Sequence, residues 1–404
     1  MHSEGLDLDR LRADTPGAEH VVHLNNCGSS LPPTPVVDAM VGYLRAEALE
    51  GGYEIAADRA DQLADFHTAT AEYLGAEAGQ IALASGAAEA WWRAFTAVPL
   101  SPGDRILVTT SEYQANAFGW MTAAERGAEV EVIPVDADGL VDLDAFDAMI
   151  DERVKLVSFT MISLGNGAVQ PAAAAAARLR QTGSSAVFLL DACQAAGQMP
   201  LDVEALGCDF LVYTGRKFMR GPRGTGVLYA RRSVLDRLGP AWFVDGRSAI
   251  WQADNSYELL GGAQRFEFGE FGYGAKIGLA VATRYMLDVG IDAIAERVGR
   301  LSERLRDQLG SIDAVTVHDE GASPTDRCGI VTFTVEGVAS ADLAVVLREH
   351  GINTSVPHRT AAQLDLGRRD LTDVVRAGVH YFNTESELDR LCEVVQAASP
   401  QWGS

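Results

Sequence analysis

The sequence has little positive charge and no long uninterrupted hydrophobic run. Its 33 lysines and arginines face 56 aspartates and glutamates, which gives a formal net charge of −23. A surface of this charge repels phosphate backbones and anionic lipids, so nucleic acid and membrane partners are not expected. No stretch reaches the roughly 18 apolar residues of a membrane span, and the start MHSEGLDLDRLRAD lacks a basic region followed by an apolar one. We therefore expect a cytoplasmic protein that acts on a small molecule.

Cysteine is scarce and scattered, which excludes two common ways of stabilising a fold. The five cysteines are an odd number and form no CxxC pair: Cys27, Cys193, Cys208, Cys328 and Cys392. A disulfide framework and a structural zinc site both need cysteines in suitably spaced sets. We expect neither, and the sequence predicts no metal site.

Apolar residues are abundant enough for two domains. At 404 residues the chain exceeds what one hydrophobic core normally supports, and 47% of its residues are hydrophobic. From about Ile81 to Tyr229, helical patterns alternate with strand-like runs, of which the clearest are RILVTT, EVEVIPVD, KLVSFTMIS, VFLLDA, CDFLVYT and GVLYA. This alternation predicts an α/β domain with a mostly parallel sheet covered by helices on both faces.

The pattern changes after Ala275. A long amphipathic helix is expected over residues 277–310, and the short strands GIVTFTV and VVRAGVHYF follow between further helices. These segments predict a smaller α+β domain. We expect a large domain over residues 22–274 and a small domain formed by residues 1–21 and 275–404.

Two segments place candidate cofactor-binding residues where a strand gives way to a turn. In ALASGAAEAWWRAF, Gly86 and Ala87 follow a strand and open a helix, whose free backbone N–H groups favour a phosphate. In VFLLDACQAAG, Asp191 ends an apolar strand, where a cation such as a pyridinium nitrogen would stabilise its buried charge. Gln194 follows it and could reach a neighbouring oxygen. An ordinary βα turn and a helix N-cap aspartate are the alternatives.

The segment VYTGRKFMRGPRGTGVLYAR holds Lys217 on a short connection between two apolar runs, directly after Thr214 and Arg216. Burial and a neighbouring positive charge both lower the pKa of a lysine, as Schiff-base chemistry requires. A strand-end aspartate followed by such a lysine turn is more specific than either part alone. In TSEYQANAFGW, Tyr113 follows a strand end and could stack on a planar cofactor, although a core tyrosine is the alternative.

Together these segments resemble the class V aminotransferase group of fold type I pyridoxal 5'-phosphate (PLP) enzymes. This group includes cysteine desulfurases, isopenicillin N epimerase and hercynylcysteine sulfoxide lyase. The similarity covers nearly the whole chain, from HLNNCGSSLPP to RAGVHYFNTESELDRL. It implies a mostly parallel seven-stranded sheet between helices in the large domain, and a homodimer whose sites are lined by both chains.

The resemblance also implies roles for the matching residues. Lys217 would bond covalently to the cofactor aldehyde, and Asp191 would pair with the pyridine nitrogen. The other cofactor contacts would come from Gly86, Ala87, Thr214 and Arg216 at the phosphate, Gln194 at the ring hydroxyl, Tyr113 at the ring face, and Asn166. The substrate would contact Asn25, Asn26, Arg223 and Arg376. Arg376 matches the pattern RxxxxxxNT and would bind the α-carboxylate, with a surface ion pair as the alternative.

The sequence also departs from the family pattern. Family members commonly have histidine at Tyr113 and threonine at Ala87, and their sheet-end asparagine could correspond to Ser163 or to Asn166 in SLGNGAVQP. Glu270 replaces a hydroxyl residue in RFEFGEFGYG. Desulfurases carry a nucleophilic cysteine in the loop that here has the sequence NTSVPHRTAAQLDLGRR. Without a thiolate there is no acceptor for the sulfur, so desulfuration is not expected.

The turn RKxxRGPRGTG and the segment RFExxE look more like hercynylcysteine sulfoxide lyase and its relatives, including lincosamide-pathway enzymes. This resemblance favours a carbon–sulfur β-lyase of secondary metabolism, which would cleave an S-substituted cysteine or its sulfoxide to a thiol or sulfenate, pyruvate and ammonia. Arg223, Trp251 and Arg359 are candidates for the S-substituent, with an interface arginine, a core indole and a solvated charge as alternatives. Decarboxylation-coupled deamination to an aldehyde, transamination and epimerisation are the alternative reactions.

Overall fold

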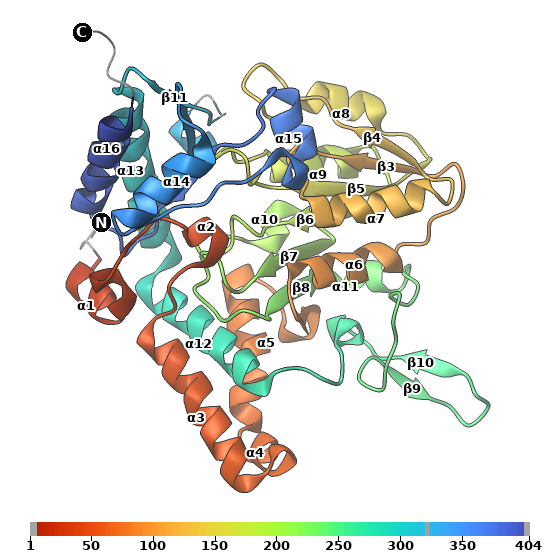
Figure 1. Cartoon of the computed structure of the whole chain (residues 1–404). Helices are drawn as coiled ribbons and strands as arrows, with labels where there is room; N and C mark the ends of the chain where they lie inside the picture. The colour runs from red at the N-terminus through yellow and green to blue at the C-terminus, as the bar shows by residue number, and fades with distance from the viewer. Residues whose placement is uncertain (1–5, 320, 322, 400–404) are drawn as a thin grey trace, which may run out of the picture.

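The computed structural model describes residues 6–319, 321 and 323–399. Figure 1 shows a large α/β body, a smaller C-terminal layer of helices and strands beside it, and two projections that stand away from both. The outer ends of the expected small domain, residues 1–5 and 400–404, lie outside the described residues. The domain boundaries themselves stay a prediction.

A seven-stranded sheet forms the centre of the large body. Its spatial order is β2-β8-β7-β6-β5-β3-β4. The strands are β2 (Ile81–Ala84), β3 (Arg105–Val108), β4 (Glu129–Val132), β5 (Val154–Thr160), β6 (Val187–Asp191), β7 (Phe210–Thr214) and β8 (Gly226–Ala230). Only β8 runs antiparallel to its neighbours β2 and β7, and the other pairings are parallel. The expected mostly parallel seven-stranded sheet is confirmed.

Each central strand is buried on both faces because successive side chains enter two different cores. On β7, for example, Phe210 and Val212 belong to one core, while Leu211 and Tyr213 belong to the other. The first core is covered by α6 (Ala87–Ala97) and α7 (Gln114–Ala124), and the second by α9 (Ala172–Gln181) among other helices. Two covered faces explain why these strands are continuous apolar runs in the sequence.

Further helices precede the C-terminal layer. They are α3 (Thr34–Glu50), α4 (Gly52–Asp58), α5 (Ala60–Leu74), α8 (Leu143–Met149), α10 (Val203–Leu206), α11 (Arg232–Leu235) and α12 (Tyr273–Val289). Short 3-10 turns lie at Ala78–Gln80 and Ala263–Phe266. Among them, α12 packs along α3 and α5, although these two helices come much earlier in the sequence.

The C-terminal layer contains a three-stranded antiparallel sheet with the order β11-β12-β14. Its elements are α13 (Ile291–Gly310), β11 (Val315–Val317), β12 (Ile330–Val335), α14 (Ser340–Glu349), α15 (Gln363–Arg368), β14 (Val375–Gly378) and α16 (Glu385–Ala398). The N-terminal segment joins this layer, since β1 (Val22–His23) pairs in parallel with β13 (Ile352–Asn353). Short elements flank these strands: α1 (Leu8–Ala13), α2 (Asn26–Ser29) and 3-10 turns at Pro16–Glu19, Pro324–Asp326 and Arg359–Ala361.

The single long helix expected over residues 277–310 is wrong. The structure has two helices, α12 and α13, which meet at Gly290. Gly290 has φ 90° and ψ 111°, and it is at once the C-cap of α12 and the N-cap of α13. A positive φ of this kind favours glycine, so the turn between the helices is set at this residue.

Two projections leave the large body in Figure 1: the α3–α4 corner, and a hairpin of β9 (Ala249–Trp251) and β10 (Tyr257–Leu259). The hairpin exposes three large apolar side chains, because Ile250, Trp251 and Tyr257 are 54%, 80% and 53% exposed. Across the residues that the structure describes, no helix is both long and apolar enough to cross a membrane.

Candidate active site

A cavity of about 450 Å³ lies at the edge of the central sheet where the parallel strands end. Asp191 ends β6, Thr214 ends β7, and Gly86 follows the end of β2. In an open α/β sheet, ligands bind in the crevice beyond these carboxyl ends. The cavity therefore lies where the fold predicts a binding site.

Most of the site residues expected from the sequence line this one cavity. They are Gly86, Ala87, Tyr113, Asp191, Gln194, Thr214, Arg216, Lys217, Arg223 and Arg376. Asn25, Asn26 and Asn166 are not among its lining residues. The structure thus brings the sheet-end and lysine-turn candidates together and leaves the three asparagines outside.

Lys217 is half-buried in the cavity wall. Burial lowers the pKa of its amine, and the positive charges of Arg216 and Arg376 act in the same direction. The chain contains only two other lysines, Lys155 and Lys276, and neither lines this cavity. Lys217 is therefore the one lysine placed to react with a ligand there.

A buried arginine fixes the turn that carries Lys217. Arg220 has φ 57° and donates hydrogen bonds to the Leu31 carbonyl, the Tyr381 hydroxyl and the Thr15 hydroxyl. Its backbone N–H also donates to the carbonyl of Lys217. The lysine turn is therefore held against both the N-terminal segment and the C-terminal layer.

Asp191 is 5% exposed and both of its carboxylate oxygens are engaged. Oδ1 accepts the backbone N–H of Cys193, and Oδ2 accepts Nδ2 of Asn116, each at 2.9 Å. The same Asn116 nitrogen donates to Oε1 of Glu112, also at 2.9 Å. These bonds fix the orientation of the Asp191 carboxylate and tie it to a second buried carboxyl group.

Glu112 lies behind Asp191 and is 2% exposed. It also accepts the hydroxyls of Ser158 and Thr160 at 2.7 and 2.6 Å. Burial raises the pKa of Glu112 to about 7, although its three hydrogen bonds act in the opposite direction. This carboxyl group therefore titrates close to neutral pH.

The turn after β2 offers a site for an anion. Gly86 is the N-cap of α6, no side chain caps the helix there, and a Cβ at Gly86 would meet open space. The start of β8 approaches this turn so closely that a Cβ on Gly226 would lie 2.5 Å from the Gly86 carbonyl carbon. Free N–H groups at a helix N-terminus favour a phosphate. The backbone supplies these groups, so the turn can bind a phosphate although position 87 is alanine and not threonine.

Three arginines line the cavity. Arg216 donates to the carbonyl of Gly28, and its pKa is lowered by burial and then by the charge of Arg223. Arg376 donates through Nε to the Ser355 hydroxyl and through Nη1 to the Leu164 carbonyl, both at 3.1 Å. Arg376 is thereby held in place at the cavity wall, as a residue that binds a carboxylate needs to be.

The residues present fit pyridoxal phosphate. The cavity offers an amine for an aldehyde, a fixed carboxylate for a ring nitrogen, and an uncapped helix start for a phosphate. The side-chain oxygen Oε1 of Gln194 is buried without a hydrogen-bond partner among the described residues, as expected for a side chain whose polar end faces a ligand. Glu270 is not among the residues that line this cavity. It is exposed in a small adjoining hollow that shares Ser85 and Gly224 with the cavity.

The expected asparagines have other partners. Asn26 donates to the carbonyls of His23 and Gly378, so it joins the N-terminal segment to β14. Asn25 packs against Gly28, where an added Cβ would lie 2.3 Å from its Oδ1. Asn166 donates to the buried carboxylate of Asp365, and Ser163 bonds to the same group. Both candidates for the sheet-end asparagine are thus tied to α15.

Arg359 and Trp251 also lie apart from the cavity lining. Arg359 donates to the Leu371 carbonyl and pairs with Asp370 at 3.1 Å. Trp251 lies on the β9–β10 hairpin. Within this chain, Arg223 is the candidate for the S-substituent that lines the cavity.

Sequence reasoning missed several lining residues, among them Asn116, Thr160, Cys193 and Ser355. The signal for Asn116 was its place in the first turn of the helix that follows β3, because this edge of the sheet holds the other candidates. Ser355 had no comparable signal in the sequence. It belongs to the C-terminal layer, and only the packing of this layer against the large body places it at the cavity.

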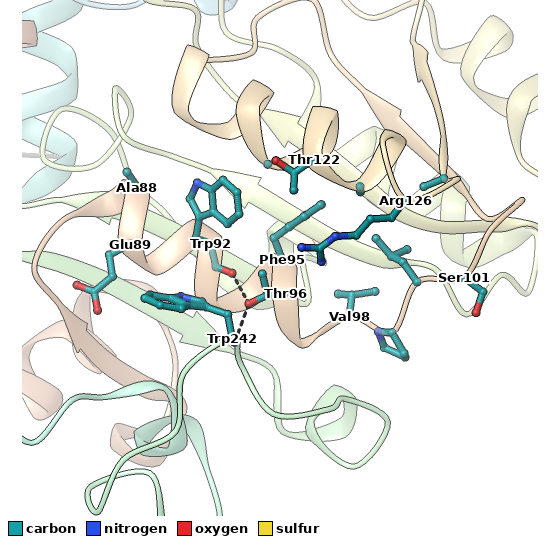
Figure 2. Close-up of a pocket in the computed structure, with 15 residues that line it drawn as sticks. Ala88, Glu89, Trp92, Phe95, Thr96, Val98, Ser101, Thr122, Arg126 and Trp242 are labelled. Carbon is teal, nitrogen blue, oxygen red and sulfur yellow. Dashed lines mark hydrogen bonds between the residues drawn. The ribbon is translucent and has the colours of Figure 1, made fainter.

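A larger hollow of about 750 Å³ lies away from Lys217, between α6, α7 and Trp242 (Figure 2). Its lining is mainly apolar, with Trp92, Phe95 and Trp242 on its walls, and Glu89 and Arg126 are its charged residues. Thr96 links the two sides by donating to the Trp92 carbonyl and accepting the Trp242 N–H. The hollow contains none of the groups that favour PLP, so the smaller cavity is the candidate active site.

Thiol chemistry is poorly supported in the cavity. Cys193 lines it, but burial and the nearby Asp191 raise the pKa of its thiol. The loop over residues 353–369, which carries the nucleophile in desulfurases, has no cysteine. A thiolate that could accept sulfur is therefore not formed readily here.

Comparison with known proteins gives a match over nearly the whole chain. The family model described as aminotransferase class-V matches residues 22–391. A probable cysteine desulfurase 2 of Mycobacterium leprae is 33% identical over 419 residues, an alignment that covers 98% of this chain and 98% of that protein.

Two solved structures show the likeness in three dimensions. The apo structure of a cysteine desulfurase from Thermococcus onnurineus NA1 has 26% sequence identity and a TM-score of 0.90, covering 98% of this chain and 99% of that one. A complex of the cystine C-S lyase C-DES with cysteine persulfide has 24% identity and a TM-score of 0.85, covering 96% and 100%. At that identity the second likeness shows the fold alone.

Proposed function

The chain belongs to the class V aminotransferase family of PLP enzymes, and from this premise we propose that it is a carbon–sulfur β-lyase. It has the PLP fold type I, and its cofactor is PLP. The proposed substrate is an S-substituted cysteine or its sulfoxide. Cleavage of the Cβ–S bond releases a thiol or a sulfenate and aminoacrylate, and water converts aminoacrylate to pyruvate and ammonia.

The cofactor, when bound, withdraws electrons from the substrate and makes its Cα–H bond acidic. The chain's residues supply the remaining functions. The Asp191 carboxylate, whose orientation is fixed by Asn116, would stabilise the positive charge of the ring nitrogen. The N-terminus of α6 at Gly86, with Thr214 and Arg216, would hold the phosphate, and Gln194 and Tyr113, which line the same cavity, would contact the ring.

Lys217 is the proposed general base. Its lowered pKa leaves more of the amine neutral near physiological pH than an exposed lysine would have. With substrate in the cavity, Nζ of Lys217 would take the Cα proton and could pass a proton to the departing sulfur. Arg376 holds the α-carboxylate and Arg223 faces the S-substituent.

One observation separates the proposal from desulfuration, the activity in the names of the relatives. Persulfide transfer requires an accessible thiolate near the substrate sulfur. The loop over residues 353–369 supplies no thiol, and the pKa of the cavity thiol Cys193 is raised. With Lys217 present and no suitable thiolate, elimination of the sulfur group is the reaction the site supports best.

We propose further that the active unit is a cytoplasmic homodimer whose sites are lined by both chains. The exposed apolar side chains of the β9–β10 hairpin support a partner surface on this side of the molecule. A net charge of −23 is consistent with small-molecule substrates rather than nucleic acid.

Product analysis tests the proposed reaction. Cofactor-loaded protein is mixed with L-cysteine and a panel of cysteine S-conjugates and sulfoxides, and pyruvate is followed with lactate dehydrogenase. Pyruvate, ammonia and a thiol, or a sulfenate from a sulfoxide, in equal amounts support β-elimination. Alanine with persulfide would establish desulfuration, and carbon dioxide with an intact carbon–sulfur bond would establish decarboxylation. Either result, or a keto acid that retains the sulfur, would overturn the proposal.

A further inference from the structure

The buried carboxyl group behind Asp191 has no part in the reaction proposed above. Glu112 follows β3 and lies just before the start of α7, outside the lining of the cavity. It accepts hydrogen bonds from two β5 hydroxyls, Ser158 and Thr160, and from the α7 side chain of Asn116. A carboxyl group this deeply buried is unfavourable in its charged form, so its retention here calls for a reason.

Asn116 connects Glu112 directly to the group that faces the cofactor. Its Nδ2 donates one hydrogen to Glu112 Oε1 and the other to Asp191 Oδ2, each at 2.9 Å. The two carboxyl oxygens therefore cannot lie further apart than two hydrogen-bond lengths. Asp191 is the titratable group that faces Glu112 across this bridge.

We propose that Glu112 is a positioning residue which, through Asn116, sets the charge around Asp191 and so the protonation of the cofactor. When Glu112 is ionised, a second negative charge adjoins Asp191 and stabilises protons on the ring nitrogen and on the Lys217 nitrogen bound to the cofactor. When Glu112 is protonated, that contribution is lost. The hydrogen bonds of Glu112 are compatible with both states, because the hydroxyl of Ser158 or Thr160 can turn to accept the proton of the neutral carboxyl group.

The raised pKa of Glu112, about 7, places the change between these states near neutral pH. The cofactor would therefore respond to pH through a carboxyl group that never touches it. The inference depends on the family cofactor and not on carbon–sulfur cleavage, so a failure of the proposed reaction leaves it open to its own test.

The test follows the absorbance of cofactor-loaded protein against pH in the absence of substrate. Glu112→Gln keeps the size of the side chain and removes its charge. We expect the pH midpoint of the Lys217-bound cofactor to fall by about 1 pH unit, as for the loss of one nearby negative charge. Glu267→Gln is the matched control, because Glu267 is equally buried but bonds to His67 and to the Leu83 N–H instead. Its midpoint should stay near the wild-type value.

Two further variants keep the test decisive. Ser158→Ala removes one hydroxyl donor from Glu112, which favours its protonated form, and should shift the midpoint in the same direction by a smaller amount. It decides the question if Glu112→Gln does not take up cofactor. In an Asn116→Ala background, Glu112→Gln should shift the midpoint by less than half as much.

An unchanged midpoint in both Glu112→Gln and Ser158→Ala would overturn the proposal. An equal shift of the pH midpoint in Glu267→Gln would also overturn it, because the loss of any buried carboxylate would then have the same effect. A full shift that persists without Asn116 would overturn the route through that residue.

Discussion

Lys217 is one of three lysines, and its surroundings differ from those of the other two. Lys276 is almost fully buried in α12 and its pKa is also lowered by burial, but the charge of Glu267 acts on it in the opposite direction. We predict that Lys217→Ala abolishes the absorbance of lysine-bound cofactor and lowers kcat by about 100-fold or more, as for loss of a general base. Lys276→Met, the matched control, should retain the absorbance. Spectra of both purified variants check this, and a persistent band in Lys217→Ala would identify the wrong lysine.

Glu112 also links pH to stability. Its pKa is raised from about 4.5 to about 7 in the folded protein, so the folded state binds the proton more tightly. The stabilisation is complete below pH 4.5 and is lost as the pH rises through 7, an effect of about 3 kcal/mol. Urea unfolding of cofactor-free protein at pH 5 and pH 8 should show a smaller fall for Glu112→Gln than for wild type. Equal falls would show that the protonation of Glu112 does not change between pH 5 and pH 8.

Some site residues could be predicted from the sequence because their backbone position decides their role. Asp191 and Lys217 follow strands of one sheet, so the carboxyl ends of those strands bring them together. The bridge from Asp191 through Asn116 to Glu112 could not be predicted, because it depends on side-chain directions between α7 and the end of β6. Asn166 shows the opposite case, since its loop directs it to Asp365 rather than to the cavity.

At the scale of elements, one glycine sets the angle between two helices. Gly290 separates α12 from α13 with φ 90°, whereas Gly299 lies within α13, and a Cβ at either position meets open space. Gly290→Ala should therefore destabilise the protein by about 1–2 kcal/mol through backbone strain alone. Gly299→Ala should stabilise it by about 0.5–1 kcal/mol. Thermal unfolding of both variants checks the signs, and stabilisation by Gly290→Ala would mean that the two helices can merge.

Strands were more predictable than their ends and directions. Two buried faces make each strand an apolar run, and all six apolar segments predicted as strands, from RILVTT to GVLYA, contain a strand of the sheet. The run EVEVIPVD ends as a strand at Val132, two residues before Pro134, which has no N–H for a further ladder bond. The antiparallel direction of β8 has no signature in its own residues, since it follows from the short lysine turn after β7.

At the scale of the whole molecule, charge and apolar surface oppose each other. A net charge of −23 favours separate, mutually repelling chains. The β9–β10 hairpin nevertheless exposes Ile250, Trp251 and Tyr257 to solvent, and Trp242 and Phe243 lie exposed in the preceding segment. Exposed apolar side chains on a strongly acidic protein support the proposal that a partner covers this surface.

The proposed homodimer can be tested on this hairpin. Burying two large apolar side chains contributes about 1.5–3 kcal/mol each, so the double variant Ile250→Ser and Trp251→Ser should raise the dimer Kd by at least 100-fold. Val345→Ser is the control, because Val345 is 57% exposed on α14, away from the hairpin. Sedimentation velocity over a range of concentrations measures the effect. If both chains line each site, activity should fall with the dimer fraction and recover at high protein concentration. A wild-type protein that is monomeric and fully active at micromolar concentration would contradict both statements.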